Sequence, residues 1–482
     1  MPTAARRSRE QARKAKLDAQ AKYDAAGTGR RLSGWNPPAS GPSRATEGQP
    51  KVRDRANDAA RNDWVGASTA QKWTTALVGV GVTPRWDDEA LTERWEDHAK
   101  VCDADGVCNA YALQALGVRT WFIGGEAFLR RRSRPTSLGL PAPVQFQLYE
   151  SAQLPLFDAD TWRGMPPSHD IRQGIERDIY GTRQAYWFHA QHPGELWSKG
   201  TPTPDQLVRV PADQVSHIFE PKRPGQLRGV SELAQILVRA RASADFEDAV
   251  LDRQKLGNLF LAFVRRTMPP VDSVEFDDLT GLPKFYDKDR NPLVGMQPGM
   301  IQDLLPGEDV QFANPPEAGT TFSEYMRSTH LGTASGTGLP YELMSGDIAN
   351  VSDRTLRVVI NEFRRFAEQR QWHIVIPKIV EPMVRWWAEA GLLSGAISTR
   401  KFAAAAKPEY APHGWEYIHP VQDIEGKVKA IEAGLTSVSA EVSKRGDDPK
   451  KVRQQRADDQ AADKALGLEP SGKPRGRGAQ RP

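Results

Sequence analysis

The most strongly patterned part of the chain lies between Asp353 and Ile376. Its apolar side chains recur every three or four residues and fall on one helical face: Leu356, Val359, Ile360, Phe363, Phe366 and Ala367. This spacing predicts a long amphipathic helix. Pro377 lacks the N–H that the helical ladder needs, so we expect it to end or kink this helix. An apolar segment containing Trp386 and Trp387 continues beyond it.

Other stretches have the same helical spacing. A second long helix is predicted from Gly229 to Gly257, with Ser231 as its N-cap residue. A shorter helix around Phe322 leads into a glycine-rich run from Gly332 to Pro340. Further helices are predicted within residues 52–71, 85–101, from 111 onward and within 423–466.

Alternating or β-prone apolar residues predict short strands between these helices. In the first half of the chain they cover residues 77–82, 118–123, 126–130, 144–150 and 185–189. After the second long helix they cover residues 260–264, 300–305 and 310–313, interrupted by prolines. The order of elements predicts an α+β fold, and no repeat of solenoid length is visible.

Composition and charge narrow the class of protein. The chain has 65 basic and 61 acidic residues and a net charge of +4, which is not the balance of an electrostatic nucleic-acid clamp. Residues 1–50 combine an arginine-rich start with Gly, Pro and Ser, and predict a flexible basic arm and linker. The basic C-terminal tail is interpreted in the same way. No apolar run reaches the length of a membrane span, so we expect a cytoplasmic protein whose two cysteines are free thiols.

Two acidic stretches resemble calcium loops but lack required ligands. The first, Cys102–Cys108, contains Asp103 and Asp105, yet the closing bidentate carboxylate is missing, and zinc would need further cysteines. In the second, Asp287–Asn291, a proline stands where the sharp turn needs glycine. We interpret the two stretches as an Asp/Gly turn and a hairpin tip, and we expect no metal and no cofactor.

No catalytic constellation is evident. The run Gly332–Gly338 lacks the lysine of a phosphate loop and follows a helix instead of a strand. Ser335 lacks the glycine that a nucleophile elbow requires, and Pro193 argues against a zinc-binding helix at His189 and His192. Because no nucleophile, base and orienting group occur together, we predict that the protein is not an enzyme.

The helix from Asp353 carries arginines away from its apolar stripe, namely Arg354, Arg357, Arg364 and Arg365. They could bind an anion, or they could form a solvated face with ion pairs at helical spacing, such as Asp353–Arg357. We favour the solvated face, because most charged helical faces are simply hydrated. The aromatic residues nearby are interpreted as core or subunit contacts.

Several phrases, in order along the chain, resemble the lambda-type portal protein family of tailed bacteriophages. They are Tyr23-Asp-Ala-Ala with Gly34-Trp35, Gly79-Val-Gly-Val-Thr-Pro-Arg85, Gly125-Glu-Ala-Phe128, Leu305-Pro-Gly-Glu308, Gly338-Leu-Pro-Tyr-Glu-Leu-Met-Ser-Gly-Asp347, Asn361-Glu-Phe-Arg-Arg365, Glu381-Pro382, His419-Pro-Val and Arg445-Gly-Asp-Asp-Pro449. The resemblance extends over nearly the whole chain.

This resemblance implies a ring, most often of twelve subunits, with a central channel at one capsid vertex. Double-stranded DNA passes through such a ring without sequence specificity during packaging and ejection. The implied partners are terminase, a head–tail adaptor and the major capsid or scaffold protein, with no membrane. The implied location is the virion, after assembly in the host bacterial cytoplasm.

The family fold is divided into wing, stem, clip and crown, and the resemblance implies boundaries for each. They are a flexible arm at 1–50, wing at 51–227, first stem helix at 228–258, clip at 259–317, second stem helix at 318–337, wing with a tunnel loop at 338–400, and crown helices with a basic tail at 401–482.

The resemblance also implies roles for individual residues. The residues expected in or beside the tunnel loop, close to DNA, are Ser345, Gly346, Asp347, Asn350, Ser352, Arg354 and Arg357. The structural residues of the family phrases are Pro306, Gly307, Glu308, Pro340, Tyr341, Gly346 and Asp347. The residues expected on the clip, facing terminase, are Lys284, Asp287, Lys288, Asp289 and Arg290.

Two other classes of protein remain as alternatives. Another head–tail connector or capsid-associated DNA-binding structural protein is the nearer one, although adaptors are usually much shorter than this chain. A nucleic-acid enzyme is the more distant one, and it would require metal-dependent activity at Asp103 or Asp105.

Overall fold

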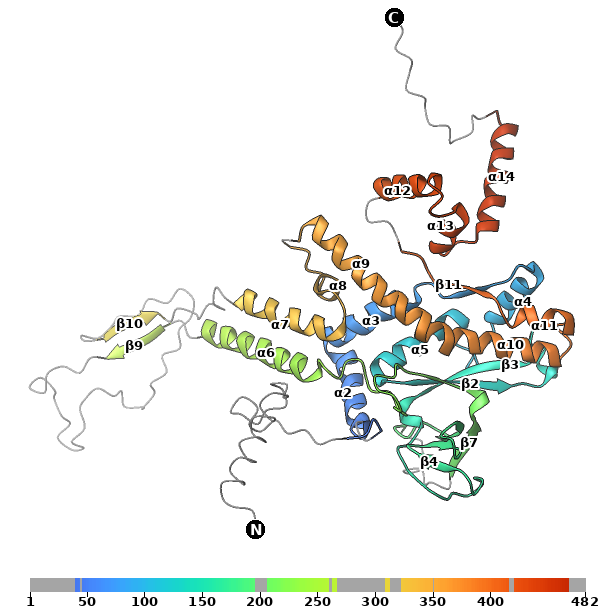
Figure 1. The fold of residues 1–482 in the computed structure, drawn as a ribbon. Helices are drawn as coiled ribbons and strands as arrows, with labels where there is room; N and C mark the ends of the chain where they lie inside the picture. The colour runs from blue at the N-terminus through green and yellow to red at the C-terminus, as the bar shows by residue number, and fades with distance from the viewer. Residues whose placement is uncertain are drawn as a thin grey trace, which may run out of the picture.

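The computed structural model describes eight segments of the chain: residues 40–43, 46–195, 206–259, 262–266, 308–312, 322–349, 351–415 and 420–467. In these segments helices and short antiparallel strands alternate, as expected for an α+β fold. A central body carries most of the elements, while a pair of helices and a group of C-terminal helices extend from it (Figure 1).

The body is built from helices packed against a small sheet. Its first four helices are α2 (Gln49–Asn62), α3 (Trp64–Val78), α4 (Glu89–Ala99) and α5 (Ala110–Gly124). The sheet has the order β3-β2-β8, formed by Val144–Glu150, Ala127–Ser133 and Val215–Ile218. Helix α5 lies between α3 and this sheet, and the core is formed there.

Two further antiparallel sheets belong to the body. A four-stranded sheet has the order β4-β5-β6-β7, formed by Asp170–Arg172, Ile175–Arg177, Arg183–His189 and Leu207–Pro211. A two-stranded sheet pairs β1 (Thr83–Arg85) with β11 (Glu409–Ala411), which joins the N-terminal part of the body to the segment before the last helices.

The projecting pair consists of α6 (Leu237–Leu259) and α7 (Phe322–Thr337), which lie side by side (Figure 1). Strands β9 (Ala262–Arg266) and β10 (Glu308–Phe312) pair antiparallel in the segment between them. Helix α6 begins at Leu237, later than the Gly229 expected from the sequence, because the residues after Ser231 form turns.

The second half of the body contains one long helical rod. It comprises α9 (Asp353–Arg370), a π-helical segment (Gln371–Val380) and α10 (Glu381–Leu393), preceded by the short α8 (Tyr341–Ser345). Pro377 was expected to end or kink the rod, but it lies inside the π-helical segment and the rod continues. The altered hydrogen-bond spacing of a π-helix is one way in which a helix accommodates such a residue.

The C-terminal part continues with α11 (Thr399–Ala405) and then α12 (Pro420–Glu432), α13 (Val438–Lys444) and α14 (Pro449–Ala465). The last three confirm the helices predicted within residues 423–466. They contact the body through Lys450, whose Nζ lies 2.5 Å from Asp87 Oδ1, and through Arg85, which donates to the carbonyl oxygen of Asp447.

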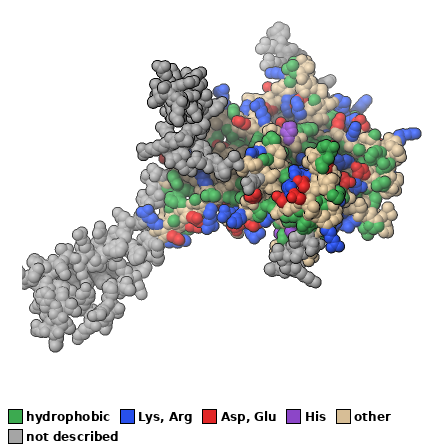
Figure 2. Space-filling view, turned by 60° about the horizontal axis from the view of Figure 1, so that its bottom comes forward, with side chains coloured by type: hydrophobic (Ala, Val, Ile, Leu, Met, Phe, Trp, Pro, Cys, Tyr) green, Lys and Arg blue, Asp and Glu red, His purple; other side chains and the backbone are tan. Residues whose placement is uncertain are grey.

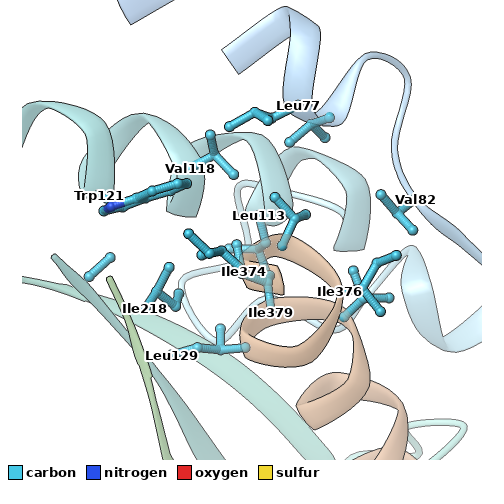
Figure 3. Packing of buried hydrophobic residues seen from close by; sticks show 14 of the residues in the cluster. Leu77, Val82, Leu113, Val118, Trp121, Leu129, Ile218, Ile374, Ile376 and Ile379 are labelled. Atoms are coloured by element: carbon cyan, nitrogen blue, oxygen red, sulfur yellow. The ribbon is translucent and has the colours of Figure 1, made fainter. Parts of the chain in front are cut away.

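The core joins α3, α5, the π-helical segment and the three-stranded sheet. Figure 3 shows Val118 and Trp121 of α5 between Leu77 on one side and Ile374 and Ile218 on the other. All of these side chains are buried.

Two predicted strands are wrong. Residues 118–123 belong to α5, and residues 77–82 contain the end of α3 followed by a turn at Gly79 and Gly81, which have positive φ angles. Helix α5 is buried on most of its sides, so it has no polar face to give a helical period. A short continuous apolar run of this kind cannot be distinguished from a strand by periodicity alone.

Candidate functional site

The predicted tunnel-loop residues lie where α8 leads into α9. Gly346 ends α8 in the left-handed conformation, with a φ of 76°. The carboxylate of Asp347 accepts hydrogen bonds from Tyr341 Oη at 3.0 Å and from the backbone N–H of Ala349 at 2.9 Å. The Ser345 hydroxyl accepts from the backbone N–H of Asp347. The structure therefore brings Ser345, Gly346 and Asp347 together with Tyr341 in one hydrogen-bonded turn.

This turn is anchored to the body on its inner side. Tyr341 and Met344 are buried, and the Ser68 hydroxyl donates to the carbonyl oxygen of Met344 at 2.8 Å. The Trp73 indole N–H donates to the carbonyl oxygen of Thr337 at 3.0 Å, just before Pro340. Both donors come from α3, so α3 holds the connection between α7 and α9.

The outer part of the same segment is exposed. Ile348 is 70% exposed, and Ser352 caps α9 by accepting from the backbone N–H of Thr355 at 3.2 Å. Arg354 is also exposed, and Arg357 Nη2 lies 3.8 Å from Asp353 Oδ2. The approach of these residues to DNA stays a prediction.

The arginines of α9 do not form one uniform face. Arg365 is exposed, but the Arg364 guanidinium lies 5.6 Å from the ring centre of Trp415 and is partly buried. Burial lowers the pKa of Arg364 from its ordinary value. The sequence interpretation of a solvated face therefore holds for Arg354 and Arg365 and is wrong for Arg364.

Arg370 has a structural role that the sequence analysis missed. Its guanidinium lies 4.5 Å from the ring centre of Trp73 and 4.7 Å from that of Phe366. It also forms ion pairs with Glu220 at 2.8 Å and Glu232 at 3.3 Å. The sequence contained one signal for this role. Arg370 lies on the apolar stripe of the helix, seven residues after Phe363, and a cation that is buried there needs acidic partners.

A buried ion network lies where the chain leaves the body toward α6. Its centre is Glu126, just before β2 and inside one of the family phrases, and its cation is Arg228. Both side chains are fully buried. The carboxylate of Glu126 accepts hydrogen bonds from Arg228, His217, Gln49, Ser151 and the backbone N–H of Gly229.

The network fixes the protonation states of its members. Burial disfavours the charged form of Glu126, but the charge of Arg228 and the hydrogen bond from His217 outweigh it, so the pKa of Glu126 lies well below its usual range. Burial lowers the pKa of His217 to about 3. The neutral imidazole therefore donates from Nε2 to Glu126 at 2.9 Å and accepts at Nδ1 from Arg183 at 2.6 Å.

Two glycines make a close backbone crossing beside this network. Gly125 has a φ of 90°, and a Cβ atom there would lie 2.5 Å from the backbone nitrogen of Ser231. A Cβ atom on Gly229 would lie 2.0 Å from the carbonyl oxygen of Gly125. The segment that leads to α6 thus crosses the end of α5 in direct backbone contact, and side chains at either position are excluded.

Most of the glycine-rich run, residues 332–337, is part of α7 and not a loop. A Cβ atom on Gly332 would lie 2.8 Å from Arg239 Nη1, and one on Gly336 would lie 2.8 Å from Ile236 Cγ2. The glycines therefore let α7 approach α6 and the segment before it closely. That packing explains a run which in the sequence resembled an anion-binding loop.

The acidic turn at residues 102–108 has a structural explanation. The carboxylate of Asp103 accepts hydrogen bonds from the backbone N–H groups of Asp105, Val107 and Cys108. Cys102 and Cys108 are free, and burial raises the pKa of Cys102 to about 12. Within the described segments, no group of three or more His, Cys, Asp or Glu side chains is placed to hold a metal ion.

Several predicted residues lie outside the described residues. They are Asn350, Pro306, Gly307 and the clip residues Lys284, Asp287, Lys288, Asp289 and Arg290. Glu308 begins β10 and is paired in register with Arg266 of β9. Among the helices that the structure describes, none is both long and apolar enough to cross a membrane.

Comparison with known families identifies the class of protein. A family model described as phage portal protein, lambda family, matches residues 28–371. Since the match covers well over half of the chain, the protein belongs to the lambda family of phage portal proteins. The resemblance expected from the sequence phrases is thereby confirmed.

Curated relatives agree with this family. The chain is 25% identical to the probable portal protein of Halomonas phage phiHAP-1, over 78% of this chain and 70% of the relative. It is 22% identical to the portal protein of Escherichia phage N15 and to portal protein B of Escherichia phage lambda, in each case over 92% of this chain and 90% of the relative.

Solved structures give a more distant likeness. The neck of a native GTA particle, computed with C12 symmetry, is 14% identical with a TM-score of 0.45, over 92% of this chain and 99% of that chain. The neck of an empty GTA particle, computed with C6 symmetry, is 15% identical with a TM-score of 0.46, over 88% and 99%. Family membership thus rests on the sequence comparisons.

Proposed function

We propose that this portal protein assembles into a ring of identical subunits, twelve in the ordinary form, around a channel for double-stranded DNA. The ring lies at one vertex of the virion capsid and acts as a structural conduit without catalytic activity. It receives terminase during packaging and a head–tail connector afterwards, and it nucleates head assembly in the host cytoplasm. Family membership supports this proposal.

The observation that carries the ring is the projecting pair α6 and α7. These two helices, which we call the hairpin, are too thin to bury apolar side chains on all sides. They nevertheless carry large apolar side chains, and Val238, Leu251 and Tyr325 are 77%, 49% and 58% exposed. Tyr325 also packs against Phe246 of α6, which is 41% exposed, with 5.5 Å between the ring centres. Adjoining exposed apolar groups are typical of surfaces that become buried in an assembly. In a ring, the hairpin of each copy lies against the hairpins of its neighbours.

The distribution of charge supports a conduit. Acidic and basic side chains are interspersed over the face shown in Figure 2, without a continuous basic surface. Each cation that binds a DNA phosphate adds salt-dependent affinity, and many such contacts would hold the duplex in place. A mixed surface is therefore suited to DNA that must slide.

We assign the family's regions to the described elements as part of this proposal. The body with α9 and α10 forms the wing, α6 and α7 form the stem, the segment containing β9 and β10 forms the clip, and α12 to α14 form the crown. The outer part of the turn after α8, together with the start of α9, faces the channel. The clip residues Lys284, Asp287, Lys288, Asp289 and Arg290 face terminase.

Electron microscopy of the purified protein tests the ring. We expect ring-shaped particles for the wild type and loss of rings for Leu251→Asp, because a charge would be buried between neighbouring hairpins. Leu393→Asp is the matched control, since Leu393 is 82% exposed at the end of α10, on the opposite side of the body from the hairpin (Figure 1). A wild type that stays monomeric at all protein and salt concentrations would refute the ring.

The channel-facing turn is tested separately. Replacing Asp347 and Asn350 together should leave rings intact and reduce DNA packaging or retention, because the exposed part of the turn is then no longer held by Tyr341 and Ala349. If this variant fails to form rings, the turn is a subunit contact.

The alternative function, another head–tail connector or capsid-associated DNA-binding protein, requires assembled particles that do not carry DNA through their centre.

A further inference from the structure

A pocket of about 640 Å³ opens between the four-stranded sheet, β8 and the rod formed by the π-helical segment and α10. Three cationic side chains from three elements line it: Arg183 of β6, Lys378 of the π-helical segment and Arg385 of α10. No aspartate or glutamate is among its lining residues. The family assignment gives this pocket no role.

Arg183 is held in place by neutral groups. Its Nη1 donates to His217 Nδ1 at 2.6 Å and to Tyr186 Oη at 3.2 Å, and its Nη2 donates to the carbonyl oxygen of Leu227 at 3.2 Å. The guanidinium also lies 5.5 Å from the ring centre of Phe219. These contacts orient the guanidinium without neutralising it, because the His217 imidazole is itself uncharged.

Lys378 and Arg385 add to this positive charge. Burial and the nearby charge of Arg183 both lower the pKa of Lys378 from its ordinary value. Its backbone is fixed, since the Ser216 hydroxyl donates to the carbonyl oxygen of Lys378 at 2.6 Å. Arg385 Nε lies 4.0 Å from Glu389 Oε1, but Glu389 lies closer to Arg131, at 2.6 Å.

We propose that this pocket binds a phosphoryl anion, either free phosphate or a phosphate group of DNA. Three cations compensate the charge of a phosphate at neutral pH, and guanidinium groups match the geometry of its oxygens. A bound phosphate would relieve the repulsion between Arg183 and Lys378. The volume accommodates a phosphate together with the sugar next to it. This proposal does not depend on ring formation.

Calorimetric titration of the full chain with inorganic phosphate, in chloride buffer at constant ionic strength, tests the site. We expect binding to the wild type that weakens at least about tenfold in Lys378→Met and in Arg385→Met, since each loses a charge-assisted contact. Lys100→Met is the matched control, because Lys100 is exposed on the surface and pairs with Asp97. Equal melting temperatures without phosphate would show that all variants fold.

Competition experiments distinguish free phosphate from a phosphate group of DNA as the bound anion. A short DNA duplex that displaces phosphate from the wild type identifies the DNA backbone as the ligand, and a duplex that does not compete identifies free phosphate. Absence of phosphate binding, or equal affinity in the wild type and both pocket variants, overturns the proposal. Equally strong displacement by glutamate overturns the preference for a phosphoryl group.

Discussion

The body and the projecting hairpin use charge in opposite ways. In the body, Glu126 and Arg228 form an ion pair with no exposure to solvent, whereas on α6 the pair Arg241–Asp245 is at the surface, at 3.0 Å. Buried pairs are expensive to break, because the remaining charge has no solvent, while exposed pairs contribute little. The body is thus fixed from within, and the hairpin depends on what lies beside it.

The two regions can be followed separately in one sample. None of the 13 tryptophans lies in α6 or α7, so tryptophan fluorescence reports on the body and its surroundings. Hydrogen exchange of peptides from α6 and α7 reports on the hairpin.

The largest effect is expected from Arg228→Met. It leaves the Glu126 carboxylate buried beside Gly229 without its cation, and should lower the free energy of unfolding of the body by about 3–5 kcal/mol. Arg241→Met, the same change at the exposed pair of α6, should leave unfolding unchanged. Urea denaturation followed by tryptophan fluorescence measures both. Equal effects in the two variants would contradict the difference between the regions.

An intermediate effect is expected from acid, which acts on two buried histidines of the body. Burial lowers the pKa of His98 to about 4 and that of His217 to about 3, from an ordinary value of 6.5. The unfolded chain therefore binds these protons first, and stability is fully present above pH 6.5 and falls as the pH decreases below it. Between pH 6.5 and 5 each histidine should account for about 2 kcal/mol.

The low pKa of Glu126 adds a second loss, which begins below the ordinary glutamate value of 4.5. The measurement is the urea midpoint of the body as a function of pH. His98→Gln should reduce the slope between pH 6.5 and 5, while His373→Gln, at an exposed position of the rod, should not. A slope that is unchanged in His98→Gln would show that this histidine is already accessible to protons.

The smallest effect is expected from alanine at two helical glycines. Gly336→Ala places a methyl group against Ile236 at the base of the hairpin and should destabilise the contact between α6 and α7 by about 1 kcal/mol. Gly426→Ala, on α12 with open space around it, should stabilise its helix by about 0.5–1 kcal/mol. Hydrogen exchange should become faster in α7 and slower in α12, and the same sign in both would contradict the packing argument.

The sequence correctly predicted elements that have one face in the core and one face in solvent. Strand β3 has the predicted bounds, residues 144–150, and α9 begins at the predicted Asp353. The second half of α5 was misread as a strand because the helix is buried on most sides. The glycine-rich part of α7 shows no helical period because its glycines serve packing against a segment about a hundred residues earlier. A hydrophobic period appears in the sequence only where an element has one buried and one exposed face. Elements that are buried on most sides therefore show no such period.

The candidate site was predicted only in part, for a related reason. The phrase from Gly338 to Asp347 located the turn, and the family phrase containing Glu126 marked an important position without explaining it. The partners of Glu126 come from positions 25 to 103 residues away in the sequence, and Arg370 meets Glu220 and Glu232 only in the folded chain. Such pairings depend on tertiary structure and have no local pattern.

The crossing of Gly125 and Gly229 has a consequence for how this chain can vary. The two positions are separated by 103 intervening residues, yet they form one steric unit in which neither can gain a side chain while the other stays in place. No compensating substitution exists at the partner, because the partner already has the smallest possible residue. Lineages that diverge at almost every other position around the hairpin base would have to keep both glycines or move the hairpin.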